Sequence, residues 1–72
     1  MICKVQRSLT QGGERMLIYS EDRRAIFHEG PLAGDVAELL GADMKCFVEA
    51  RLVGKGGWSI IHRLPQIEWP TW

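Results

Sequence analysis

Four side chains of the types that bind zinc are spread along the 72-residue sequence: Cys3, His28, Cys46 and His62. Zinc sites in small domains usually draw their ligands from short paired motifs, and no two of these four residues form such a pair. Each cysteine lies on the apolar face of a segment with alternating hydrophobicity, which favours a core position. A thiol in the core behaves as a small hydrophobe with a raised pKa. We therefore predict no metal site, no cofactor and no cysteine nucleophile, and we expect both thiols to stay reduced.

Two other patterns resemble catalytic motifs. Glu21, Asp22 and Glu29 could form an acid/base set, but carboxylates in or beside turns are usually solvated or bonded to the local backbone. The segment 54–57 contains a lysine among glycines, as phosphate-binding loops do, yet a P-loop connects a strand to a helix and this segment lies between two predicted strands. A domain of this size also has little room for a water-excluding active site, so we predict that the protein is not an enzyme.

The composition is that of a small globular domain. Nine Lys and Arg residues balance nine Asp and Glu residues, and 46% of the residues are apolar while 25% are charged. These values exclude a disordered chain and indicate one folded unit in which nearly every apolar side chain is needed for packing. We assign residues 1–65 to a single domain and residues 66–72 to an extended tail. Because no apolar run is long enough for a membrane segment or a signal peptide, we expect a cytoplasmic protein.

Alternating hydrophobicity and turn residues predict five strands. The segment 44–53 alternates most clearly, with apolar residues on one face and mostly charged residues on the other. The expected strands are Ile2–Leu9, Arg15–Tyr19, Arg24–His28, Met44–Val53 and Trp58–Leu64. The first three are joined by short turns and therefore form a meander.

One short helix is predicted between the third and fourth strands. Its apolar stripe consists of Leu32, Val36, Leu39 and Leu40. We expect Gly30–Pro31 to end the meander and the helix to begin either near this proline or with Asp35 as its N-cap, and to end at Gly41. This order of elements predicts a mostly β, five-stranded barrel-like domain of the OB type, with an SH3-like barrel or an open α+β sheet as alternatives. A closed sheet removes exposed edges, which favours the barrel.

Basic and aromatic residues share one face of the fourth predicted strand. A ring for base stacking beside cations for phosphates is the composition that OB-folds use to bind single strands. The candidate nucleic-acid-binding residues are Lys45, Phe47, Arg51, Arg24 and Arg63. Glu49 lies on the same face, and such alternating charge is also typical of a solvated strand. Binding of single-stranded nucleic acid is therefore the alternative function.

The tail carries Ile67, Trp69 and Trp72, which are too apolar for a solvated segment. Large rings of this kind either pack back on their own domain or anchor an interface with another molecule. The first functional hypothesis is accordingly a small non-enzymatic protein-interaction or accessory module. Its partner would be another protein or a second copy of the chain, bound through the tail.

The segments Val5–Leu9 and Met16–Arg23, together with the tail that ends at Trp72, resemble small uncharacterised proteins encoded in bacteriophages and prophages. The resemblance is confined to the first part of the chain and its extreme end. It implies a phage or prophage gene and a bacterial cytoplasm. It implies no activity, cofactor or catalytic residue.

Overall fold

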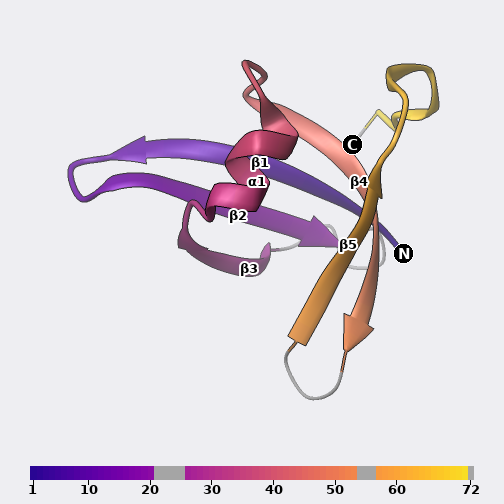
Figure 1. Cartoon of the computed structure of the whole chain (residues 1–72), viewed down its shortest axis with the longest axis horizontal. Helices are drawn as coiled ribbons and strands as arrows, with labels where there is room; N and C mark the ends of the chain where they lie inside the picture. Colours follow the sequence, from indigo (N-terminus) through magenta and orange to yellow (C-terminus); the bar gives the residue numbers. More distant parts are fainter. Residues whose placement is uncertain (21–25, 54–56, 72) are drawn as a thin grey trace.

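The computed structural model describes residues 1–20, 26–53 and 57–71. Five antiparallel strands form one curled sheet, and a short helix lies over its concave face (Figure 1). The elements are β1 (Ile2–Thr10), β2 (Gly13–Ser20), β3 (Ile26–Pro31), α1 (Gly34–Leu40), β4 (Lys45–Val53), β5 (Gly57–Arg63) and a 3-10 turn, η1 (Gln66–Glu68). The predicted mostly β, barrel-like domain with a single short helix is confirmed.

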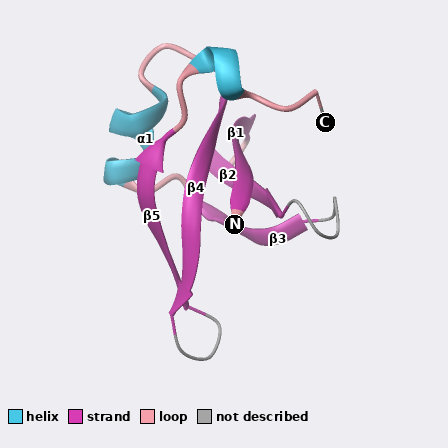
Figure 2. Ribbon diagram, turned by 90° about the vertical axis from the view of Figure 1, so that its right-hand side faces the viewer, coloured by secondary structure: helices cyan, strands magenta, loops and turns pink. Residues whose placement is uncertain are grey.

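The strand order in the sheet is β3-β2-β1-β4-β5, so β1 is central and β3 and β5 are the two edges. Val5 of β1 shows this arrangement, because it pairs with Ile18 of β2 on one side and with Cys46 of β4 on the other. The sheet curls into a half-barrel with β5 and β3 at its two ends (Figure 2). We call the open side of the half-barrel, between the edge strands β3 and β5, the seam.

The core fills the concave side of the sheet. Its fully buried side chains alternate along three strands, as a half-buried sheet requires, and α1 covers them with two residues spaced four apart, Val36 and Leu40. The core residues contributed by the strands are Cys3, Val5, Met16, Ile18, Cys46, Val48 and Ala50. Both cysteines therefore occupy the core face that the sequence pattern predicts.

The boundaries of β3 and α1 differ from the prediction. Gly30 and Pro31 do not end the meander, because they pair with Met16 and Arg15 at the end of β3. A proline is acceptable there since β3 is an edge strand and needs backbone donors toward one neighbour only. The helix begins at Gly34, so Asp35 lies inside the first turn instead of capping it, and Gly41 ends the helix with a positive φ of 60° as predicted.

A bulge in the β4–β5 pair controls how β5 meets the helix. Glu49 pairs with His62 and Ala50 pairs with Ile60, so Ile61 has no partner in the ladder, and its side chain is 51% exposed. The extra residue reverses the alternation beyond it. As a result, Ile60 and Arg63 both lie on the concave side.

Two arginines bind the carbonyl groups at the C-terminal end of α1. Arg63 donates from Nη1 to the carbonyl oxygen of Leu39 at 2.8 Å, and from Nη2 to the Asp43 carboxylate. Arg7 of β1 donates from Nη2 to the carbonyl oxygen of Gly41 at 2.8 Å. Guanidinium groups are well suited to this position because the last helical carbonyls have no partner within the helix. Arg63 thus joins α1 to the edge strand β5.

We predict that Arg63→Met lowers the free energy of unfolding by about 2 kcal/mol, because it leaves helix carbonyls without a charged donor. The matched control is Arg51→Met, since Arg51 is exposed and forms no ion pair in the described parts of the chain. The control should change stability by less than about 0.5 kcal/mol in a urea titration. Equal effects of the two substitutions would contradict the role given to Arg63.

Candidate functional site

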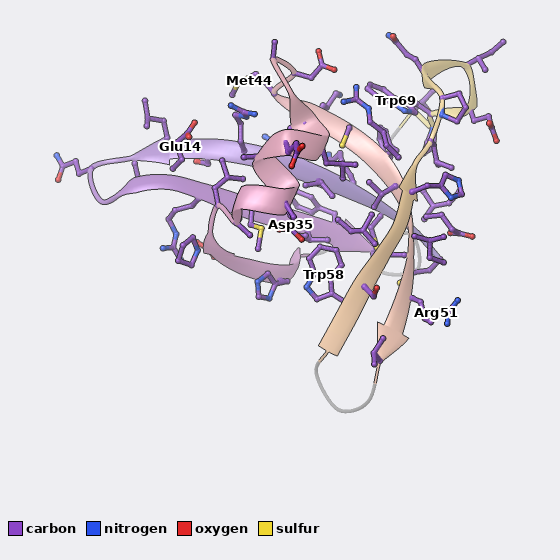
Figure 3. All side chains as sticks on the ribbon, in the orientation of Figure 1. Glu14, Asp35, Met44, Arg51, Trp58 and Trp69 are labelled. Carbon is purple, nitrogen blue, oxygen red and sulfur yellow. The ribbon has the colours of Figure 1, made fainter. Side chains whose placement is uncertain are left out.

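A cleft of about 380 Å³ opens in the seam, beside the helix and the edge strand β5. We call it the seam cleft. It is lined by Met16, Ala33, Asp35, Val36, Trp58, Ser59 and Ile60. Figure 3 shows Trp58 and Asp35 near one another, with Trp69 toward the opposite end of β5. A volume of this size is within the range of ligand pockets.

Local structure fixes the walls of the cleft. Trp58 and Ile60 are two residues apart on β5, so both side chains lie on its concave side and pack against the core. The ring of Trp58 also meets the ring of His28 on β3, with centroids 6.2 Å apart and a tilt of 45°. The two edge strands therefore touch through side chains across the seam.

The cleft has a mixed lining. Five of its seven lining residues have apolar side chains and the other two are Asp35 and Ser59, which are both exposed, and the surface open to the cleft is more polar than apolar. The Asp35 Oδ1 accepts a hydrogen bond from the Val36 amide at 2.9 Å, which orients the carboxylate. Within residues 1–20, 26–53 and 57–71, Asp35 takes part in no ion pair. The lining thus combines an indole ring, aliphatic groups and one carboxylate.

The backbone of β5 adds a further binding feature. In the described parts of the chain, β5 pairs with β4 and β3 pairs with β2, and the two edge strands share no ladder. The outer side of an edge strand presents backbone N–H and C=O groups that another strand can pair with. The seam cleft lies directly beside this edge.

The predicted nucleic-acid face is only partly present. Lys45 and Arg51 are exposed, as expected, but Phe47 is 2% exposed because Trp69 packs on it with ring centroids 5.5 Å apart. The prediction that Phe47 offers its ring to a base is therefore wrong. Arg63 is turned toward α1, and Arg24 lies outside the described residues.

The tail folds back on the domain and is not fully extended. After Leu64 the chain forms η1, and the Trp69 Nε1 donates to the carbonyl oxygen of Leu64 at 2.9 Å. The Arg63 guanidinium lies 5.4 Å from the centre of the Trp69 ring. Ile67 is 94% exposed, and Trp72 lies outside the described residues. Of the proposed tail anchors, Trp69 serves intramolecular packing and Ile67 points to solvent.

The side chains expected to be reactive are dispersed. In the part of the chain that the structure describes, no three His, Cys, Asp or Glu residues gather as metal ligands would. Burial raises the pKa of the Cys46 thiol, an effect that nearby Arg63 opposes and Asp43 reinforces. None of the described helices has the length and apolar character needed to cross a bilayer.

Sequence reasoning did not select the seam cleft. The sequence patterns identify Trp58 only as the first residue of a predicted strand and Asp35 only as an alternative helix N-cap. The available signal was the spacing of Trp58 and Ile60, which places both on one face of a strand. The missing information was the position of the helix relative to that strand, which depends on the bulge at Ile61.

Comparisons of the chain with protein-family models, with curated proteins and with solved structures find no match.

We predict that Trp69→Ala lowers the free energy of unfolding by about 2–3 kcal/mol, because it removes the ring that covers Phe47. The matched control is Ile67→Ala, two residues away on the exposed side of the turn, which should change stability by less than about 0.5 kcal/mol. Urea titrations of the two variants measure both effects. A stable Trp69→Ala variant would show that the tail is not part of the core.

We predict that iodoacetamide leaves Cys46 unmodified in the native protein at mildly alkaline pH and alkylates it in denaturant, because the thiolate is the reactive form. Since the raised pKa belongs to the folded state, the associated stability is present below the pKa of the unfolded thiol and is lost as the pH rises above it. Peptide mass spectrometry locates the modification. Native alkylation at the rate of the unfolded chain would contradict the assignment of Cys46 to the core.

Proposed function

We propose that this protein is a non-enzymatic interaction module that binds an extended segment of a partner protein in the seam cleft. The observation that carries this proposal is the position of the cleft, which places a tryptophan-walled space beside the unpaired edge of β5. An extended segment needs both features. Backbone pairing along an edge strand supplies affinity, and a pocket that receives alternate side chains supplies specificity.

The dimensions of the elements are consistent with this mode of binding. The strand β5 has seven residues, Gly57–Arg63, and successive residues of an added strand would point alternately toward the cleft and away from it. Trp58 and Ile60 would contact the side chains that point inward. At the other end of β5, Arg63 and α1 occupy the concave side, which limits the site to the Trp58 end.

We also propose that the barrel-like fold is of the OB type. In its favour, β1 pairs with both β2 and β4, and the helix follows β3 in the chain and covers one end of a partly open five-stranded barrel. A phage or prophage origin and a cytoplasmic location likewise remain proposals that rest on the resemblance and on the composition.

Single-stranded nucleic-acid binding is less well supported than peptide binding. The convex face keeps the exposed cations Lys45 and Arg51, but the ring between them, Phe47, is covered by Trp69. Stacking platforms need an accessible ring beside the cations. The described convex face therefore offers charge for phosphates without the ring that was expected to stack on bases.

We predict that panning the protein against a displayed library of random 12-residue peptides enriches binders, and that a synthetic peptide made from them shifts the amide resonances of β5 and α1. Trp58→Leu should weaken this binding by about tenfold, because it removes a large aromatic contact. Ala33→Phe, which fills the cleft from the helix side without removing a core residue, should also weaken it. Ile67→Ala is the control and should bind like the parent protein.

The proposal fails if no peptide is enriched, or if the shifts gather around Ile67 or Lys45 and Arg51 instead of the cleft. A (dT)12 oligonucleotide titrated at low salt serves as the competing probe. Salt-sensitive shifts with this oligonucleotide alone would favour the nucleic-acid alternative.

A further inference from the structure

We infer that the seam cleft selects an arginine side chain in the bound segment, which stacks on the Trp58 ring and pairs with the Asp35 carboxylate. This inference rests on the proposed function and specifies the chemistry of its partner. It assigns to Asp35 a role in specificity that is separate from the backbone pairing along β5.

The charge of the cleft is complementary to that of a cationic side chain. Among the described residues that line the cleft, Asp35 is the one charged side chain. Four acidic residues of the described chain have basic partners, as in the pairs Arg15–Glu29 and Arg63–Asp43, whereas Asp35, Glu38 and Glu68 have none. Of these three, Asp35 is the one that lines the cleft. A carboxylate without a counter-ion in the lining of the cleft favours a cationic side chain over a neutral or acidic one.

The combination of ring and carboxylate favours arginine over lysine. A guanidinium group is planar, stacks on indole rings and is more weakly hydrated than an ammonium group, so it packs against the Trp58 ring more readily. It also presents several N–H donors, which can bond to a carboxylate while the plane of the group lies on the ring. The molecule itself shows a related contact, because the Arg63 guanidinium lies over the Trp69 ring while it binds Asp43.

The geometry of Asp35 fits this role. Its Oδ1 accepts a hydrogen bond from the Val36 amide at 2.9 Å, which favours one orientation of the exposed carboxylate, and Oδ2 takes part in no hydrogen bond within the described residues. The opposite wall is the Trp58 ring, whose position is supported by His28 at 6.2 Å between ring centroids. The ring, and to a lesser degree the carboxylate, are therefore oriented before the guanidinium binds, which lowers the entropy lost on binding.

The test compares Asp35→Asn with Glu38→Gln in the same selection from random 12-residue peptides. Glu38 is the matched control because it is exposed on the same helix, does not line the cleft and forms no ion pair in the described chain. Each substitution removes one negative charge from α1, so a general charge effect would be the same in both. Sequencing of the selected pools reports the frequency of arginine at each aligned position.

We expect the parent protein and Glu38→Gln to enrich arginine several-fold at one aligned position, and Asp35→Asn to lose this enrichment. In a synthetic peptide from the selection, replacing that arginine by its uncharged analogue citrulline should weaken binding to the parent by about tenfold. The same replacement should have little effect on binding to Asp35→Asn. Combining the two replacements, one in the peptide and one in the protein, isolates the interaction between the peptide guanidinium and the Asp35 carboxylate.

The outcomes separate this inference from the proposed function. Peptides that bind at β5 without a preference for arginine, or with equal effects of Asp35→Asn and Glu38→Gln, would overturn the inference and leave the binding module intact. Enrichment of lysine in place of arginine would overturn the inference that the cleft selects a planar guanidinium group. Failure to select any peptide would overturn both proposals.

Discussion

The structure depends on one constraint: the five-stranded sheet, with the strand order β3-β2-β1-β4-β5, curls without closing into a barrel. Its edge strands β3 and β5 share no ladder, so their outer backbone groups remain open to pairing. Exposed edges favour aggregation unless they are covered. Here the cover is partial: α1 and Arg63 occupy one end of the seam, and the contact between His28 and Trp58 bridges another part of it. The seam cleft is the space that this incomplete cover leaves.

The bulge at Ile61 connects the fold to the site. Trp58 and Ile60, which precede the bulge, face the concave side of the sheet. Because the bulge reverses the alternation along β5, Arg63, which follows it, faces the same side. The hydrogen bonds from Arg63, together with Arg7 and the core packing of the helix, then hold α1, and α1 supplies Asp35 and Val36 to the cleft. One irregularity in a single strand pair thus contributes both to the support of the helix and to the walls of the cleft.

The sequence predicted the elements better than their contacts. Alternation of period two located β4 and β5 and placed both cysteines in the core, because side chains on a half-buried strand must alternate. The same alternation could not show that Trp69 returns to cover Phe47, since facing away from the core does not exclude burial under a tail. It also could not show that Gly30 and Pro31 continue β3, because that depends on β3 being an edge strand. The seam cleft was missed for a related reason: its walls come from a helix and a strand whose relative position no local pattern encodes.

The central claim is that the unpaired edge of β5 receives an extended segment. The most direct measurement is a set of intermolecular NOEs between isotope-labelled protein and an unlabelled peptide obtained by selection. We predict NOEs from the peptide backbone to the backbone of β5 at its Trp58 end, together with contacts from peptide side chains to the Trp58 ring, as strand pairing at this edge requires. NOEs confined to η1 or to the convex face around Lys45 and Arg51 would contradict it.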